Sequence, residues 1–122
     1  MIKVLPLAMV FLLFACSQTG NKLKGPLATG WQDKKVCEKL WENKHETILR
    51  CTFAPGIGHE KHTHNKNFGY ALSGGKVQIT DDRGTRVVNL ATNSYFQSNG
   101  VNWHEIKNVG DTTVVYLIIE SK

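Results

Sequence analysis

The sequence contains no long stretch with the hydrophobic period of an amphipathic helix, and this argues against a helical fold. The apolar run from Val4 to Phe14 is interrupted by Pro6, and it is shorter than the roughly 20 residues that a membrane-spanning helix needs. No run of lysine and arginine reaches five residues and no basic helix is indicated, so nucleic acid is not an expected partner. The 122 residues contain no internal repeat, and this length favours a single domain.

Cysteine is scarce, and the first of the three cysteines follows the apolar run. Lys3, the apolar run and Leu13-Phe14-Ala15-Cys16 together have the pattern of an export signal. The last four residues resemble the lipobox of bacterial lipoproteins, in which cleavage precedes the cysteine and its thiol carries a diacylglycerol. We expect residues 1–15 to be a lipoprotein signal peptide and Cys16 to be the lipidation site. The alternatives are an ordinary signal peptide with a chance cysteine, or a buried N-terminal helix.

The resemblance to lipoproteins implies a location in the cell envelope. Lipid on Cys16 would hold the protein at a membrane on the periplasmic side, and Ser17 is a residue type that goes with outer-membrane sorting in enterobacterial lipoproteins. Residues 16–30 are polar and rich in Gly, Lys and Thr, which is typical of a flexible tether, so the folded domain is expected over residues 31–122. Without Lys3 the chain has 14 basic and 10 acidic residues, an excess that fits a solvated surface or weak attraction to anions.

Cys37 and Cys51 are the two remaining cysteines. An exported protein folds in an oxidising compartment, where a disulfide is allowed. Residues 36–42 and 46–53 are expected to form two strands joined by a three-residue turn. Counting outward from that turn places Cys37 opposite Cys51, where Cβ atoms are about 4.5–5.5 Å apart and close to the spacing of a disulfide. The alternative is a pair of buried, reduced cysteines.

From residue 35 onward, short β-rich segments alternate with turn signals. Residues 76–80 alternate polar and apolar side chains, and Asp81-Asp82-Arg83-Gly84 is a turn before a returning strand at 85–90. Further strands are expected at 37–41, 47–53, 70–72, 94–97, 101–107 and 112–120. About eight or nine short strands at regular spacing predict an all-β sandwich or small barrel.

Three of the five histidines lie within Gly58-His59-Glu60-Lys61-His62-Thr63-His64. This cluster fits a metal site, a proton shuttle or a polar surface loop. His62 and His64 are two residues apart, so on a strand both imidazoles point to one face and form half of a metal site. His104, in the expected strand 101–107, is the candidate third ligand. Imidazole suits zinc, copper, iron and nickel.

These residues resemble the two sequence motifs of the cupin family. Pro55-Gly56, five further residues, His62-x-His64 and Tyr70-x-Leu72-Ser73-Gly74-Gly75 are similar to the first motif, and His104-Glu105-Ile106-Lys107-Asn108 is similar to the end of the second. The resemblance covers about residues 35–120 and is strongest to small single-domain cupins, some of which are named β-alanine degradation proteins. It implies a double-stranded β-helix, a jelly-roll barrel. It further implies a divalent Fe, Mn, Zn, Cu or Ni ion held by His62, His64 and His104.

The chain departs from the family motifs in two places. The glutamate of the first motif is absent, because Asn67 and Phe68 occupy the positions at which it is counted. Asn67 is retained as a possible weak ligand, and the expected shell is three neutral histidines. The second motif carries one extra residue before His104.

The other two histidines are not expected to bind metal. His59 has odd spacing from His62 and His64, so on a continuous strand it faces away from them, at the surface or the mouth of the barrel. His45 lies in a turn and is expected to be solvated.

Strand phase also selects three candidate pocket residues. Tyr70 and Leu72 share the phase of His64 if no bulge intervenes, and Trp103 is placed near the mouth. Either Tyr95 or Phe96, whichever faces inward, is a further candidate. Aromatic side chains at such positions also serve as core filling, so no catalytic residue is assigned.

Three functions fit these expectations. The first is a metal-dependent oxygenase or isomerase that acts on a small polar molecule. The second is a non-catalytic cupin of the cell envelope that binds a metal or a small ligand such as a carboxylate. The third is a structural lipoprotein with a vestigial site, since the fold by itself does not fix a reaction. The expected partners are the small-molecule ligand, the membrane through the lipid anchor, and a second copy in a homodimer.

Overall fold

The computed structural model describes residue 20 and residues 22–122, and the expected signal peptide and Cys16 lie outside these residues. The described part is built from strands, and it contains no helix long and apolar enough to cross a membrane. The strands are β1 (Gly30–Trp31), β2 (Lys34–Lys35), β3 (Cys37–Glu42), β4 (Glu46–Phe53), β5 (Gly58–His64), β6 (Asn67–Ser73), β7 (Gly75–Asp81), β8 (Gly84–Leu90), β9 (Tyr95–Ser98), β10 (Val101–Asn108) and β11 (Val114–Ser121).

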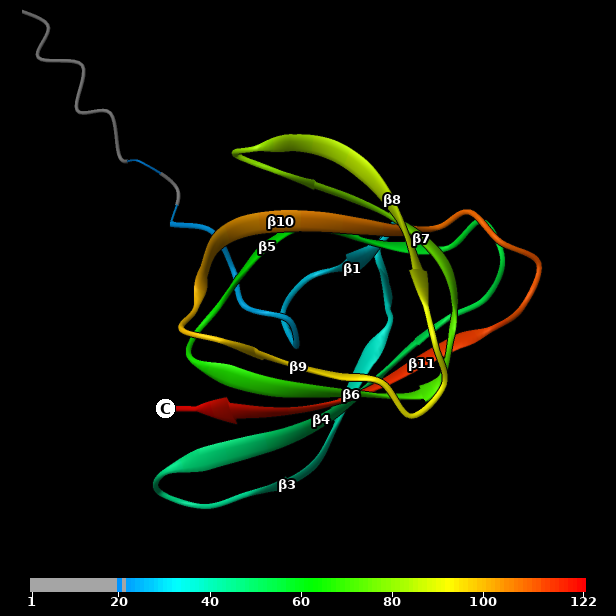
Figure 1. Ribbon diagram of the computed structural model, residues 1–122. Helices are drawn as coiled ribbons and strands as arrows, with labels where there is room; N and C mark the ends of the chain where they lie inside the picture. The colour runs from blue at the N-terminus through cyan, green and yellow to red at the C-terminus, as the bar shows by residue number, and fades with distance from the viewer. Residues whose placement is uncertain (1–19, 21) are drawn as a thin grey trace, which may run out of the picture.

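Two antiparallel sheets face each other, as the ribbon shows (Figure 1). One sheet has four strands in the order β5-β10-β7-β8, and the other has five in the order β3-β4-β11-β6-β9. Several strands that are neighbours in a sheet are far apart in sequence, as in β5 with β10 and β6 with β11. The arrangement is a jelly roll, and it confirms the all-β prediction.

The core lies between the sheets and follows from the alternation of side chains along each strand. In β4, Leu49, Cys51 and Phe53 are buried while the residues between them are exposed. The same alternation buries Val114, Tyr116 and Ile118 of β11. Partly buried apolar side chains of the opposite sheet pack against this cluster, among them Ile79, Val88, Leu90 and Ile106.

The structure pairs Cys37 with Cys51 in a disulfide, although the turn differs from the expected one. The N–H of Asn43 donates to Glu46 O at 3.0 Å, so the turn is one residue longer than predicted. Glu42 therefore pairs with Thr47 instead of Glu46. A register shift at Leu40, between Lys39 and Trp41, restores the pairing further out. The two deviations compensate each other, and the cysteines end up opposite one another.

Two glycines of the first motif occupy positions that a side chain would disturb. Gly56 has φ of +80°, a left-handed conformation that glycine adopts readily. A Cβ on Gly74 would lie 2.1 Å from Leu90 O, so this position needs glycine for the close approach of the backbone to β8. Both glycines thus lie at the tight positions that the motif implies.

The segment before β1 lies against the four-stranded sheet. The N–H of Thr63 on β5 donates to Lys24 O at 3.0 Å, and Pro26 is buried. We expected residues 16–30 to be a flexible tether, but the structure holds residues 24–29 of that range against the barrel. The physical reason is that their backbone carbonyls find partners on β5, which composition alone does not reveal.

Candidate metal centre

Three histidine nitrogens meet at one point inside the barrel. His62 and His64 lie on β5, and His104 lies on the neighbouring β10, opposite His62. His62 Nε2 is 3.0 Å from His64 Nε2 and 3.0 Å from His104 Nε2, and the ligand atoms of all three lie within 4.8 Å of one another. Nitrogens that each lie about 2.1 Å from one ion are separated by about 3–3.5 Å. The structure therefore brings together the three histidines that the sequence selected, and the two separations from His62 Nε2 fit a shared metal.

The outer nitrogens of two of these rings fix their tautomers. His62 Nδ1 lies 2.6 Å from Glu60 O, and His64 Nδ1 lies 2.6 Å from Glu120 Oε2. A carbonyl and a carboxylate only accept hydrogen bonds, so both Nδ1 atoms carry the proton and both Nε2 atoms carry a lone pair when the rings are neutral. Two lone pairs then face each other across 3.0 Å, which is repulsive unless a cation or a shared proton lies between them.

The surroundings of the cluster disfavour protons on the rings of His62 and His104. Burial, and then positive charge on His59 and His104, lowers the pKa of His62 to about 2. Burial, and then charge on His64 and His59, lowers the pKa of His104 to about 3. A divalent cation fits such a donor set better than a proton, because it is shared by three nitrogens and needs only their lone pairs.

Glu120 is a member of the site that the sequence reasoning did not select. It lies on β11, in the opposite sheet, and its side chain is 13% exposed. Its Oε2 accepts from His64 Nδ1, and its Oε1 accepts from the N–H of Asn65 at 3.2 Å. A carboxylate on the outer nitrogen of a metal ligand orients the ring and raises its basicity. Its place in the expected strand 112–120 does not indicate a contact with a histidine 56 residues away.

His59 is buried, and the expectation that it faces away from the other histidines is wrong. The pairing of β5 with β10 contains a register shift between His59 and His62, with one extra residue on β5. This shift reverses the phase of the strand, so His59 lies on the interior face with His62. The two rings are stacked with centroids 3.7 Å apart.

His59 connects the metal centre to the N-terminal segment and to the disulfide. Its Nε2 lies 3.1 Å from both Pro26 O and Thr29 O, so this nitrogen carries the proton. Its Nδ1 then faces Cys37 Sγ at 3.8 Å. His59 is thus not one of the three converging ligands, but its ring stacks on the ring of His62 and helps to hold it in place.

A second register shift explains the extra residue in the second motif. Between Val101 and His104, β10 has one residue more than the facing part of β5. The extra residue is absorbed there, and His104 still lies opposite His62. Asn108, which ends the motif, is fully buried and serves the fold, since its Nδ2 donates to Phe53 O at 2.8 Å and to Thr112 O at 2.7 Å.

The histidines lie in a cavity of about 440 Å³ between the two sheets. Most of its wall is apolar, with side chains from β4, β7, β8, β10 and β11. Asn67 lines this cavity, and its Nδ2 donates to Asn65 O at 2.8 Å, so ligation through its oxygen remains a prediction. Phe96 on β9 contributes an aromatic ring to the same wall.

One side of the cavity is charged. Arg83 and Arg86 each donate to Asp81 Oδ2 at 2.9 Å, and Asp81 is opposite His104 in the pairing of β7 with β10. These hydrogen bonds hold the pKa of Asp81 well below its usual range. Two guanidinium groups share the Asp81 carboxylate, and the nearby Asp82 also acts on Arg83, so the charges of this rim nearly balance.

The three candidate pocket residues lie outside the cavity. The chain passes from one sheet to the other between His64 and β6, so the alternation of buried and exposed residues along β5 does not continue into β6. The buried residues of β6 are Asn67, Gly69 and Ala71. Tyr70 instead donates to Asn93 Oδ1 at 3.2 Å, and Leu72 is 46% exposed. Trp103 faces outward beneath the ammonium group of Lys61, 4.1 Å from its ring centroid. His45 is exposed in the turn after β3, as expected.

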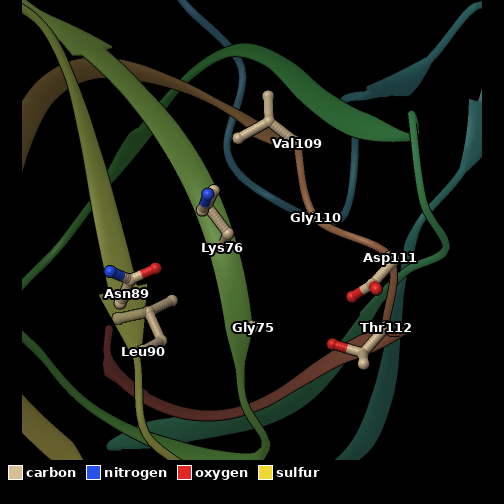
Figure 2. A pocket seen from close by; sticks show the side chains of 8 residues that line it. All are labelled: Gly75, Lys76, Asn89, Leu90, Val109, Gly110, Asp111 and Thr112. Atoms are coloured by element: carbon tan, nitrogen blue, oxygen red, sulfur yellow. The ribbon is translucent and has the colours of Figure 1, made fainter.

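A second hollow lies on the outside of the barrel. Figure 2 shows it between β7, β8 and the loop that precedes β11, with Lys76, Asn89, Asp111 and Thr112 around it. None of the histidines lines this hollow, and Lys76, Asn89 and Asp111 are exposed. We therefore assign the chemistry to the inner cavity.

Comparison with solved structures identifies the fold. The chain is similar to a cupin domain from Bordetella pertussis, with 19% identity and a TM-score of 0.66 over 84% of this chain and 99% of that one. It is also similar to a cupin superfamily protein from Desulfitobacterium hafniense, with 18% identity and a TM-score of 0.56 over 70% and 75% of the two chains. A predicted oxalate decarboxylase from Thermotoga maritima is 21% identical, with a TM-score of 0.50 over 68% and 76%.

These similarities show that the chain has the cupin fold, the double-stranded β-helix that the motifs implied. Comparison with family models and with curated proteins found no match. The similarity to solved structures therefore establishes the architecture, and the chemistry rests on the histidines themselves.

Proposed function

We propose that the protein is a metal-dependent cupin, an oxygenase or isomerase, that binds a divalent ion through His62, His64 and His104 and acts on a small molecule in the inner cavity. The observation that carries this proposal is the convergence of the ring nitrogens, since His62 Nε2 lies 3.0 Å from both His64 Nε2 and His104 Nε2. With their outer nitrogens bound to Glu60 O and Glu120, neutral His62 and His64 direct lone pairs inward, and a metal ion would satisfy both together with His104. Fe, Mn, Zn, Cu and Ni are the candidate ions.

The residues of the site have separate roles in this proposal. A metal held there supplies Lewis-acid or redox chemistry to an oxygen-bearing ligand. Glu60 O and Glu120 hold the rings of His62 and His64 with their lone pairs directed inward. The apolar wall excludes water from the ligand, which strengthens electrostatic interactions inside the cavity.

Non-catalytic binding is the second candidate function, and one observation favours it. Asp81 is the one carboxylate among the described residues that line the cavity, and two arginines hold it in ion pairs. A carboxylate in that state is a weak general base. A cupin of this kind would bind the metal and a small ligand without turning the ligand over.

The location in the cell envelope is part of the proposal. Its support is the apolar run before Leu13-Phe14-Ala15-Cys16, which resembles a lipoprotein signal. The Cys37–Cys51 disulfide agrees with an oxidising compartment. Labelling of the expressed chain with a radioactive fatty acid tests the anchor, and loss of the label in Cys16→Ala is the expected result.

Elemental analysis of the full chain tests the metal. The protein is expressed with its own N-terminal segment and purified without chelator and without an affinity tag that contains histidine. About one divalent ion per chain is the expected stoichiometry for one set of three ligands. Iron together with oxygen uptake would favour an oxygenase, and zinc would favour non-oxidative chemistry. No metal, and no uptake of any of the five ions when they are added, would contradict the proposal.

A further inference from the structure

We infer that the ligand of the inner cavity is a monocarboxylate with an apolar body, its carboxylate toward the histidines and Arg86 and its body against the barrel wall. This inference rests on the proposed metal site and names the class of molecule that the site takes. It differs from the small polar molecule that the sequence suggested, since most of the cavity wall is apolar.

The apolar body follows from the composition of the wall. Side chains from both sheets form it, and they include Val77, Ile79, Val88, Leu90, Phe96 and Ile118. These groups offer no hydrogen bonds, so a hydroxyl or amide placed against them would lose its water without gaining a partner. An alkyl chain or an aromatic ring has no hydrogen bonds to lose there, and its binding removes apolar surface of both the ligand and the wall from water.

The negative head group follows from the charges at the histidine end. The three ligands are neutral, so a divalent ion among them keeps its full charge. The nearby carboxylates are already engaged, because Glu120 binds His64 and Asp81 binds two arginines. A buried positive charge of this size calls for an anion, and the ligand is the group left to supply it.

A single anionic group follows from where the positive charge lies. Asp81 is opposite His104 in the β7–β10 pairing, and Arg86 reaches Asp81 from β8, so the arginines and the metal ligands lie at the same side of the cavity. The rest of the wall is mostly apolar, and its polar side chains, which include Asn67, Gln97 and Ser98, carry no charge. A compact dianion such as oxalate would leave the apolar wall unused, and the second carboxylate of a longer diacid would be buried without a charged partner.

The experiment measures binding of carboxylates to the full chain loaded with Zn²⁺, by isothermal titration calorimetry. Hexanoate and phenylacetate are compared with acetate and oxalate. We expect hexanoate and phenylacetate to bind at least 10-fold more tightly than acetate or oxalate. Treatment with EDTA should weaken hexanoate binding at least 10-fold, because the carboxylate then loses its principal partner.

A matched pair of variants on β8 tests the position of the apolar body. Val88→Phe fills the cavity and should weaken hexanoate binding at least 10-fold while metal content and acetate binding stay unchanged. Val87→Phe, one residue away and 57% exposed, should change neither. Arg86→Gln tests the carboxylate end of the ligand, because it removes a charge and leaves the apolar side chains of the wall in place. It should weaken binding of all four acids several-fold without loss of zinc, and unchanged binding overturns the inference even if Val88→Phe does not fold.

The outcomes separate this inference from the proposed metal site. Zinc uptake together with equal or tighter binding of acetate or oxalate overturns the inference and leaves the metal site standing. Hexanoate binding that is unchanged by EDTA, or equal in Val88→Phe and Val87→Phe, also overturns it. Failure of the wild-type chain to take up any of the five ions overturns the proposed function, and with it this inference.

Discussion

The inner cavity and the outer hollow share two strands but have opposite chemistry. Along β7 and β8, Val77 and Val88 point between the sheets and line the cavity, while Lys76 and Asn89 point outward and border the hollow of Figure 2. The period of two along a strand makes this separation. The cavity has buried nitrogen ligands and an apolar wall, whereas the hollow has exposed polar side chains. The comparison shows that the chemistry of a recess depends on which strand face borders it.

The largest expected effect is the loss of a metal ligand from the inner cavity. His62→Ala and His104→Ala should each lower metal affinity by more than about 100-fold, since ligands matter at least as much as the groups that support them. His45→Ala, which removes an exposed histidine from the turn after β3, should retain the metal. Metal content after dialysis gives the readout, with circular dichroism to check folding. Equal metal in all three variants would contradict the assignment.

Acid should destabilise the metal-free protein through the same buried rings. The pKa values of His59, His62 and His104 are lowered to about 4, 2 and 3, whereas an unfolded histidine titrates near 6.5. The unfolded state therefore binds more protons below pH 6.5, and stability present above that pH is lost as the pH falls. Each histidine contributes about 1 kcal/mol per pH unit below pH 6. Urea midpoints in EDTA should fall from pH 7.5 to pH 5, and a constant midpoint would count against neutral buried rings.

Removal of the charge on Glu120 should have a smaller effect than removal of a ligand. Glu120→Gln keeps an oxygen for His64 Nδ1 but lowers the basicity of the ring, so metal affinity should drop about 10- to 100-fold. Glu105→Gln is the matched control, because Glu105 adjoins His104 in sequence but lies outside the inner cavity. Competition with a metal-binding dye measures both affinities. The same affinity in the two variants would show that Glu120 does not support His64.

The smallest effect is expected in the outer hollow. Asn89→Ala and Asp111→Ala replace exposed side chains, and surface substitutions of this kind change stability by about 0.5 kcal/mol or less. Metal content and hexanoate binding should match those of the unmodified chain. A clear loss of either in these variants would show that the two recesses are coupled through β7 and β8.

Short-range spacing predicted an all-β fold and placed His62 and His64 on one strand face. The resemblance to the cupin motifs implied the double-stranded β-helix and the convergence of His104 with these two histidines. The position of His59 was predicted wrongly, since a register shift of one residue reverses strand phase and leaves no mark in residue types. Tyr70 was misplaced for the same reason, because the phase restarts where the chain changes sheets.

Contacts between sheets were beyond prediction from one sequence. Glu120 meets His64 across the barrel, and nothing local to either residue indicates it. The disulfide was predicted correctly, but the turn was expected one residue too short, and the register shift at Leu40 compensated. The predicted pairing of Cys37 with Cys51 was therefore correct although the predicted turn length was not.

The N-terminal segment has a consequence for the order in which the chain assembles. Lys24 and Pro26 lie far in sequence from the residues they contact, which are Thr63 and His59 on β5. Among the described strands, β10 is the one sheet neighbour of β5. The surface that receives the N-terminal segment therefore forms only when β5 has paired with β10, residues 101–108. Contacts that wait for such distant partners form slowly. We therefore expect the histidine end of the barrel to be covered late in folding, which would let an ion reach His62 before the segment closes over His59.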